Sequence, residues 1–306
     1  MSSISRTPKG VFAALATPVD SWAKLDLKGL EGLVAHITKA PVNGLCPVGS
    51  TGEGPLLERE TRMEVTRRTV EQLDGSLSVI PATVSVTERD VVTDIEGYAA
   101  LGATHVLVPP PYYYPLSAGS LGDFYHRLAA DSPLPILLYN IPQMTKISIP
   151  PSLVAELAED ENIVGIKDSS RDFEYFASVT SATSSASKGD FSVLTGSDTM
   201  LAASMLVGGD GTIAASVNLV PELVCGVYRS WVDNEYQVAM ELQGQLLKVV
   251  QACRPPSFPV GWKAALSLLG LCERYMVGPV RPASDPEVEA LADSLVSLGI
   301  QVRGTN

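Results

Sequence analysis

Lysine is the residue type whose positions say most about chemistry in this sequence. Of the nine lysines, most fall in expected helices or loops, where a solvated surface charge explains them. Lys167 differs, because Ile163 and Ile166 place it at the end of an apolar, strand-like run. Burial disfavours the ammonium form and so supplies the neutral amine that can attack a ketone and form a Schiff base. An ion pair with Asp168 or Glu53 would explain a buried lysine equally well.

Two tyrosines stand at comparable positions on the preceding apolar runs. Tyr139 ends the run just before that of Lys167, so its phenol could approach the lysine and relay protons. Tyr113 lies in the loop that follows the preceding apolar run, His105–Pro111. A single tyrosine is more often a packed aromatic with a hydrogen-bonded hydroxyl. Together with a buried lysine, however, the two phenols predict an acid–base set.

A glycine-rich turn, Gly49-Ser50-Thr51-Gly52-Glu53, follows another apolar run. Its hydroxyls and backbone N–H groups could hold an anion. The sequence matches neither Gly-x-x-x-x-Gly-Lys nor Gly-x-Gly-x-x-Gly, the phosphate-binding patterns of nucleotide sites. A small carboxylate is therefore the ligand that we expect at this turn.

Histidine and cysteine give little material for a metal site. Of the three histidines, His36 and His126 fall on expected helices and His105 begins a strand. The sequence has no HExxH motif and no Cys-x-x-Cys pair, so we expect no metal site. The cysteines are widely scattered, which favours a reducing, cytoplasmic setting over the alternative of two disulfides. They are Cys46, Cys225, Cys253 and Cys272.

The elements that must position these residues follow from eight apolar runs. The runs lack polar alternation, as is typical of parallel strands buried on both faces. They are Gly10–Pro18, Gly44–Thr51, Leu77–Ser85, His105–Pro111, Pro135–Pro142, Ile163–Ser169, Phe191–Ser197 and Gly211–Asn218. Amphipathic, helix-like stretches lie between them, among them Leu25–Lys39, Glu58–Leu73 and Glu88–Leu101. Eight consecutive strand–helix units predict an α/β fold, a (β/α)8 TIM barrel, with a doubly wound sheet as the alternative.

After Pro221 the alternation stops and only helical patterns follow. These are Val220–Val232, Glu235–Cys253, Phe258–Leu271 and Pro286–Leu298. The first completes the eighth unit, so we expect a catalytic barrel over residues 1–232 and a C-terminal helical extension over residues 233–306. The active site of such a barrel lies at the carboxyl ends of its strands.

Composition narrows the class of protein further. The chain has 306 residues, 45 % of them hydrophobic, and a net charge of −12, so it can bury a large core. The acidic excess without a basic cluster argues against nucleic-acid and anionic-membrane partners. No apolar run approaches the roughly 18 residues that span a bilayer. Residues 11–16 superficially resemble a secretion signal but end at Thr17-Pro18 without a cleavage context, and we expect a first strand there.

Taken in order and spacing, the motifs resemble the dihydrodipicolinate synthase / N-acetylneuraminate lyase family of pyruvate-dependent class I aldolases. The resemblance runs from Ala16-Thr17-Pro18 to the C-terminal helices. It is carried by Gly49-Ser50-Thr51-Gly52-Glu53, Tyr139-Asn140-Ile141-Pro142 and Gly165-Ile166-Lys167-Asp168. It implies a cofactor-independent enzyme that binds the pyruvate part of a 2-oxo acid, and a homotetramer built from dimers.

The resemblance also implies catalytic roles for matching residues. Lys167 matches the Schiff-base lysine and Tyr139 the proton-shuttling phenol beside it. Thr51 matches the hydroxyl that links this phenol to a second tyrosine. Tyr113 matches that second tyrosine, which in family tetramers reaches into the neighbouring subunit's site.

Substrate-binding roles follow in the same way. Ser50, with Gly49, Thr51 and the neighbouring backbone N–H groups, matches the site of the pyruvate carboxylate. Ile213 matches a position on the eighth strand whose backbone lies near the lysine. Ser197 begins a polar group, completed by Asp198 and Thr199, that could contact substrate hydroxyls or simply cap a helix.

One departure from the family separates its substrates. In dihydrodipicolinate synthases an arginine that recognises the second substrate's carboxylate stands two residues after Tyr-Asn-x-Pro, and here that residue is Met144. A thioether cannot make the bidentate bond of a guanidinium. Segments such as Thr195-Gly196-Ser197-Asp198 resemble instead the 2-keto-3-deoxy-sugar-acid aldolases of the family.

We therefore expect a carbon–carbon lyase that cleaves a 2-oxo-3-deoxy acid to pyruvate and an aldehyde, or forms it from them. A dihydrodipicolinate synthase, an N-acetylneuraminate lyase and a 2-oxo acid dehydratase are the alternatives within the family. A barrel that only binds a small carboxylate is the alternative from another class. The absence of a basic cluster near Tyr114–Gly119 and Ser197–Leu201 argues against a phosphorylated substrate.

Overall fold

The strands of the protein form one parallel sheet. The computed structural model describes residues 4–186 and 191–303. Within them the strand order is β3-β2-β1-β8-β7-β6-β5-β4. The strands are β1 (Gly10–Ala14), β2 (Gly44–Cys46), β3 (Ser78–Val79), β4 (Val106–Val108), β5 (Ile136–Asn140), β6 (Ile163–Asp168), β7 (Ser192–Thr195) and β8 (Gly211–Ala214). Each predicted run contains one strand, and the remainder of most runs turns away at the carboxyl end to form the loops.

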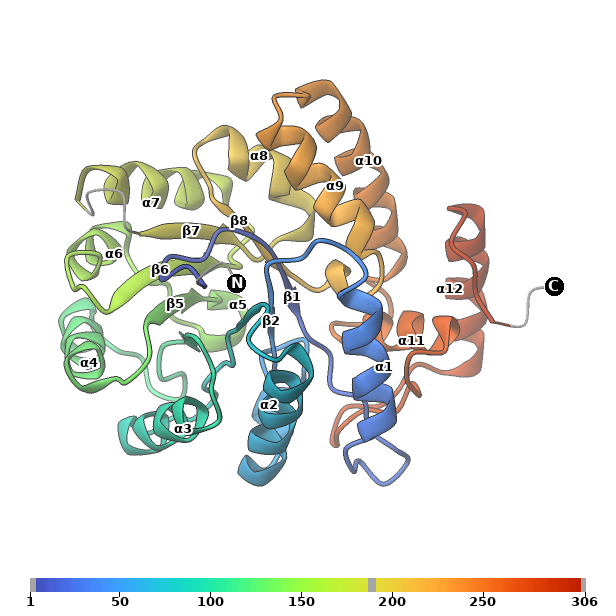
Figure 1. Ribbon diagram of the computed structural model, residues 1–306, viewed down its shortest axis with the longest axis horizontal. Coiled ribbons are helices and arrows are strands. Elements are labelled where there is room, and N and C mark those ends of the chain that lie inside the picture. The colour runs from blue at the N-terminus through green and yellow to red at the C-terminus, as the bar shows by residue number, and fades with distance from the viewer. Residues whose placement is uncertain (1–3, 187–190, 304–306) are drawn as a thin grey trace.

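The sheet curls so that its two ends approach each other. Beyond β3, Ala82 bridges Leu107 of β4 in the parallel sense. The Thr83 N–H donates to the Leu107 carbonyl at 2.9 Å, and the Leu107 N–H donates to the Pro81 carbonyl at 2.9 Å. In Figure 1 the strands occupy the centre and helices surround them, which is a TIM-barrel-like arrangement. The doubly wound alternative, an open sheet, does not fit this curl.

The surrounding helices bury one face against the strands. In α1, Leu30, Leu33 and Ile37 are buried, and Asp26 caps the helix by accepting from the Gly29 N–H. The helices of this layer are α1 (Leu27–Ile37), α2 (Arg59–Leu73), α3 (Glu88–Ala100), α4 (Ala118–Asp131), α5 (Pro142–Thr145), α6 (Pro151–Leu157), α7 (Phe173–Ala186), α8 (Leu201–Leu206) and α9 (Pro221–Val232). Short 3-10 helices follow three strands: η1 (Gly54–Leu56), η2 (Asp198–Met200) and η3 (Ser216–Asn218).

Three further helices end the chain, as the helical patterns predict. They are α10 (Tyr236–Ala252), α11 (Val260–Leu269) and α12 (Asp285–Ser297). α10 packs against α9, and α12 packs against α11 at the edge of the molecule (Figure 1). α12 begins one residue before the predicted start, because Ser284 and Glu287 form a capping box.

Two apolar clusters fill the interior. The larger lies between the strands and the helices, and the smaller lies inside the curl of the sheet. The inner cluster consists of Phe12, Ala14, Cys46, Ile80, Ala82, Leu107, Leu137, Tyr139, Ile141, Val164, Leu194 and Ile213. Tyr139 is thus an inward-facing residue of β5, as a role beside Lys167 requires.

The cysteines are all free and buried, so the alternative of two disulfides is wrong. Burial raises the pKa of the Cys46 thiol to about 11, although the charge of Lys167 acts in the opposite direction. None of the helices within residues 4–186 and 191–303 is long and apolar enough to cross a membrane.

Candidate active site

Lys167 and Tyr139 are register partners on the adjacent parallel strands β6 and β5. Both side chains are buried, with 5 % and 4 % of their surface exposed. The Lys167 Nζ lies 4.5 Å from the centroid of the Tyr139 ring. The expectation that the phenol approaches the lysine therefore agrees with the geometry.

The ion-pair alternative for Lys167 is not what the structure contains. Glu53 pairs instead with Lys263 of α11, and both side chains are buried. Glu53 also accepts from the Val277 N–H at 2.7 Å. Asp168 accepts from Asn140 and Ser170. Among the residues that the structure describes, Lys167 has no carboxylate partner.

Asp168 organises the carboxyl ends of β5 and β6. The Asn140 Nδ2 donates to it at 2.8 Å, while the Asn140 Oδ1 accepts from the Ile149 N–H at 3.0 Å. The Ser170 hydroxyl donates to the second oxygen of Asp168 at 2.9 Å. Burial raises the pKa of Asp168, and the bonds from Asn140 and Ser170 oppose that rise. These bonds hold the strand ends on which Tyr139 and Lys167 stand.

The glycine-rich turn after β2 lies beside the same phenol. The Gly54 N–H donates to the Gly49 carbonyl at 3.0 Å and closes the turn. A Cβ at Gly54 would come within 1.8 Å of the Val48 carbonyl oxygen, so the close approach requires glycine. The Ser50 Oγ lies 3.3 Å from the Tyr139 phenol oxygen.

The hydrogen bond from Tyr139 thus goes to Ser50, whereas the resemblance gives this link to Thr51. Thr51 is buried and lines the cavity described below, but within the described chain no hydrogen bond joins it to Tyr139. Adjacent side chains of a tight turn point in different directions, and the backbone angles that decide between them are not visible in the sequence.

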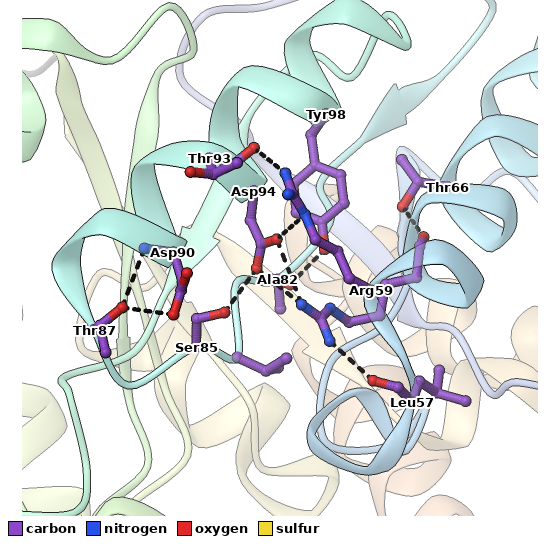
Figure 2. A network of polar contacts seen from close by, with 12 residues as sticks. Leu57, Arg59, Thr66, Ala82, Ser85, Thr87, Asp90, Thr93, Asp94 and Tyr98 are labelled. Atoms are coloured by element: carbon purple, nitrogen blue, oxygen red, sulfur yellow. Dashed lines mark hydrogen bonds and ion pairs between the residues drawn. The ribbon is translucent and has the colours of Figure 1, made fainter.

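A polar network holds the segment that follows this turn (Figure 2). Arg62 of α2 donates to the Leu57 carbonyl at 2.9 Å and to the buried Asp94 of α3 at 3.1 Å. Arg59 and Ser85 also contact Asp94, at 3.1 and 3.0 Å. The buried carboxylate therefore ties η1, α2 and α3 together behind the turn.

A cavity of about 300 Å³ opens at the carboxyl ends of the strands. It is lined by Ala14, Thr51, Tyr139, Ile141, Gln143, Met144, Lys167, Ser169, Arg171, Gly196, Ser197, Asp198, Thr199, Ile213, Ala215, Val250, Cys253, Arg254, Phe258 and Trp262. Five of the predicted site residues, Lys167, Tyr139, Thr51, Ile213 and Ser197, are therefore together in one cavity. Its volume suits a small organic acid.

Three predicted site residues are outside this lining. Ser50 lies behind the cavity wall, where its hydroxyl contacts the phenol of Tyr139. Gly49 accepts the hydrogen bond that closes the turn. Tyr113 is 75 % exposed and packs edge-to-face on Tyr114, with ring centroids 5.0 Å apart. A single chain does not bring Tyr113 to the cavity.

The polar group after β7 has one member with a clear structural bond. Asp198 accepts from the Ser216 N–H at 2.7 Å. Ser197 stands at the N-cap of η2 but makes no side-chain capping bond there. Its hydroxyl lies 3.3 Å from that of Thr199 at the cavity wall. Helix capping therefore does not account for the Ser197 side chain.

Gly196 keeps the space around the lysine open. A Cβ at this position would lie 2.9 Å from the Lys167 Cε and 2.0 Å from the Ser169 Oγ. Neither contact is tolerable without displacement of the side chains. The sequence contains Gly196 in a quoted motif but offers no sign of this contact.

Other cavity residues also escaped prediction. Arg254, Phe258 and Trp262 come from the region of α10 and α11, more than 80 residues after Lys167 in the chain. Arg171 follows β6 and adopts a left-handed backbone conformation, with φ 64°. Among the described residues, no group of three or more His, Cys, Asp or Glu lies together as a metal site would require.

Comparison with known proteins assigns the chain to a family. Residues 7–297 match the model of the dihydrodipicolinate synthetase family. A 4-hydroxy-tetrahydrodipicolinate synthase from Methanosphaerula palustris is 33% identical over 288 residues, which cover 93% of this chain and 96% of the relative. The chain belongs to the dihydrodipicolinate synthetase family. It is accordingly an enzyme, a pyruvate-dependent lyase of the class I aldolase type.

Solved structures of dihydrodipicolinate synthetase family proteins have the same fold. A monomeric variant of dihydrodipicolinate synthase superposes with a TM-score of 0.93 at 29% identity, covering 98% of this chain and 99% of the other. A prophage protein of the family from E. coli K12, solved in complex with pyruvate, gives a TM-score of 0.91 at 29% identity, covering 95% and 99%. The predicted family is therefore confirmed.

Proposed function

We propose that this lyase acts on a 2-oxo-3-deoxy acid, cleaving it to pyruvate and an aldehyde or running the reverse condensation. The observation that carries the proposal is Lys167, which is buried under the ring of Tyr139 and has no carboxylate partner within residues 4–186 and 191–303. An amine in such a place is free to add to a ketone, whereas an ion-paired ammonium is not.

The reaction begins with Lys167. Its Nζ adds to the C2 ketone, one proton is taken up, water leaves, and a protonated imine forms between Nζ and C2. Tyr139 then takes the proton of the C4 hydroxyl while its own phenolic proton passes to the Ser50 hydroxyl, 3.3 Å away, which releases a proton to water. The C3–C4 bond breaks, its electron pair moves to the iminium, and the aldehyde leaves. The remaining enamine takes a proton at C3 and is hydrolysed to pyruvate.

The substrate carboxylate belongs at the turn after β2 in this proposal. Thr51 lines the cavity at the turn, and its hydroxyl is free of Tyr139. We assign to Thr51 and the neighbouring backbone N–H groups the binding of the carboxylate, and to Ser50 the proton relay. Ile213 of β8 is buried and also lines the cavity, where we assign to it an apolar contact with the substrate.

Synthase activity is the second candidate, because the M. palustris relative carries that name. Against it stands Met144, which lines the cavity where synthases have a carboxylate-binding arginine. A thioether offers no hydrogen-bond donor to the second carboxylate. We therefore rank the sugar-acid lyase ahead of the synthase.

A substrate panel separates the two. Purified enzyme is given a series of 2-oxo-3-deoxy sugar acids, and pyruvate release is followed. In a parallel assay pyruvate and aspartate semialdehyde are supplied and their condensation is measured. We expect kcat/KM for at least one sugar acid to exceed that for aspartate semialdehyde. Equal or higher kcat/KM with aspartate semialdehyde would make the synthase the better assignment.

Quaternary structure is part of the same proposal. We propose a homotetramer, a dimer of dimers, in which Tyr113 enters a neighbouring subunit's cavity. Its support is the exposure of Tyr113 and Tyr114, at 75 % and 74 %, since large aromatic side chains rarely stay in water. Sedimentation of the wild type and of Tyr113→Ala tests it: a monomeric wild type with full activity would contradict it.

Architecture and location complete the proposal. We propose that the sheet closes as a (β/α)8 barrel over residues 1–232, with the Ala82–Leu107 bridge as its last junction, and that residues 233–306 form the extension. The turn between the end of α9 at Val232 and the start of α10 at Tyr236 supports that boundary. A cytoplasmic location is supported by the four free cysteines.

A further inference from the structure

We infer that Arg171 and Arg254 recognise a negatively charged group at the far end of the substrate, a carboxylate or a phosphate on the aldehyde half. This inference rests on the proposed function and adds to it the charge of the substrate. It departs from the argument against a phosphorylated substrate, which considered only Tyr114–Gly119 and Ser197–Leu201, because both arginines come from other segments.

The first observation is the position of the two arginines. Both line the cavity that contains Lys167, Arg171 from the loop after β6 and Arg254 from just after α10. In the proposed mechanism Lys167 and the turn after β2 hold the pyruvate half of the substrate. The aldehyde half therefore extends toward the remaining cavity residues, which include both guanidinium groups.

The second observation is that both guanidinium groups are unoccupied. Neither arginine makes an ion pair or a side-chain hydrogen bond with any other residue within 4–186 and 191–303, and both are exposed. Other arginines of the chain are held by carboxylates, as Arg62 is by Asp94 and Arg127 by Glu88. In a chain with net charge −12, two unpaired arginines in one cavity are available to an external anion.

The third observation is the chemistry of the rest of the wall. Gln143 and Met144 belong to α5, the segment where synthases carry their arginine, and the Gln143 amide donates to the Ser169 carbonyl at 2.7 Å. Asp198, the acidic residue of the lining, has one oxygen bound to the Ser216 N–H. A guanidinium offers forked donors that match carboxylate and phosphate alike. Although Met144 replaces the arginine of the synthases, Arg171 and Arg254 thus provide donors for an anion elsewhere in the cavity.

Matched substrates and variants test this inference. Condensation with pyruvate is measured for three aldehydes of equal carbon number: glyceraldehyde, its 3-phosphate, and the three-carbon aldehyde that ends in a carboxylate. We expect Arg171→Gln and Arg254→Gln to lower kcat/KM for the preferred charged aldehyde roughly 10–100-fold, chiefly through KM. The value for glyceraldehyde stays unchanged. Whichever charged aldehyde is preferred identifies the anion.

Arg281→Gln is the matched control, because Arg281 is exposed and is not among the residues of the cavity. It should leave all three values unchanged. A loss of equal size for charged and neutral aldehydes in the Arg171 and Arg254 variants would indicate a structural role. That result, or a wild-type preference for glyceraldehyde, overturns the inference.

A second readout does not need turnover. Trapping on Lys167 by borohydride is titrated with 2-oxoadipate and with 2-oxohexanoate, a chain of the same length with a methyl end. For the wild type, the concentration of 2-oxoadipate that gives half-maximal trapping should be at least about tenfold lower than that of 2-oxohexanoate. In the Arg171→Gln/Arg254→Gln protein the two concentrations should converge. Equal values in the wild type contradict the arginine assignment while leaving the lyase standing, whereas a failure of pyruvate itself to be trapped removes both.

Discussion

Tyr139 and Lys167 face each other across β5 and β6, with the Lys167 Nζ 4.5 Å from the centre of the Tyr139 ring. The aromatic face can stabilise the positive charge that develops when the lysine nitrogen becomes an iminium. The hydroxyl of the same ring lies 3.3 Å from the Ser50 Oγ. In the proposed mechanism one side chain would thus connect the electron sink with the proton relay.

Removal of the Tyr139 hydroxyl separates these two contributions. In Tyr139→Phe the ring still covers Lys167, but no phenol can move a proton. We expect kcat to fall by about 10²–10⁴-fold, while pyruvate is still trapped on Lys167 by borohydride. Ser50→Ala should lower kcat less, because the phenol remains. Steady-state rates and trapping yields are measured side by side, and a Tyr139→Phe enzyme with wild-type kcat would exclude the phenol from proton transfer.

Gly196 is expected to be essential for the freedom of the lysine. In Gly196→Ala the new methyl group meets the Lys167 Cε at 2.9 Å, so the amine is displaced and adduct formation slows. The crowding should also cost about 1–3 kcal/mol of unfolding free energy.

Gly32→Ala on α1 provides the comparison, since nothing lies within 4 Å of a Cβ there. Gly32→Ala should raise the free energy of unfolding by about 0.5–1 kcal/mol and keep full activity. Urea unfolding together with the rate of trapping tests both variants. An active, stable Gly196→Ala enzyme would show that the Lys167 and Ser169 side chains move aside at little cost, and would contradict this role of Gly196.

The buried pair of Glu53 and Lys263 joins the glycine-rich turn to α11. Lys263→Met leaves the carboxylate of Glu53 buried without its cation. This change should lower the free energy of unfolding by about 3–5 kcal/mol. Because Glu53 lies two residues after Thr51 in the turn, KM for pyruvate should rise as well. Lys248→Met, a change of the same type on the exposed face of α10, should alter neither quantity.

A double-mutant cycle makes the test quantitative. Glu53→Gln/Lys263→Met should unfold at a higher urea concentration than Lys263→Met alone, since no unpaired charge stays buried. Additive losses would mean that the two side chains do not interact.

Two histidines should give stability opposite pH dependences. Burial lowers the pKa of His105, whose Nε2 donates to the Arg6 carbonyl at 2.9 Å. Folding favours the neutral form of His105. Its contribution to the free energy of unfolding is therefore present above pH 6.5 and is lost as the pH falls below that value. Hydrogen bonds to Glu156 and Asp160 raise the pKa of His126, so its contribution is present below 6.5 and is lost as pH rises through the folded value.

Unfolding free energies at about pH 5 and about pH 8 test these signs. His105→Gln should lose less stability on acidification than the wild type does. His126→Gln should lose more. The reverse order for either variant would contradict the assigned environment of that histidine.

Much of the sheet could be predicted because parallel strands buried on both faces have a distinctive composition. Residues 11–16 and 163–166 are apolar without alternation, and each contains or overlaps a strand. The rule that active sites lie at the carboxyl ends of such strands then predicted that Lys167, Tyr139 and Thr51 lie close together, and all three line one cavity. Helix bounds were also close, since α2 and α9 begin within a residue of the expected starts.

What could not be predicted depends on contacts between distant parts of the chain. Glu53 and Lys263 are 210 residues apart, and no local pattern pairs them. Arg254 joins the cavity through the packing of α10, which sequence periodicity does not orient toward a site. The choice of Ser50 over Thr51 as the partner of Tyr139 depends on backbone angles within one turn.

Identification of the lysine that binds pyruvate tests the central claim most directly. The enzyme is incubated with pyruvate, reduced with borohydride, digested and analysed by peptide mass spectrometry. One reduced pyruvyl group on Lys167 is the predicted result, with none in Lys167→Met and an unchanged yield in Lys146→Met, where an exposed lysine near the same strand ends is removed. An adduct on another lysine, or no adduct in an enzyme that releases pyruvate, would contradict the account.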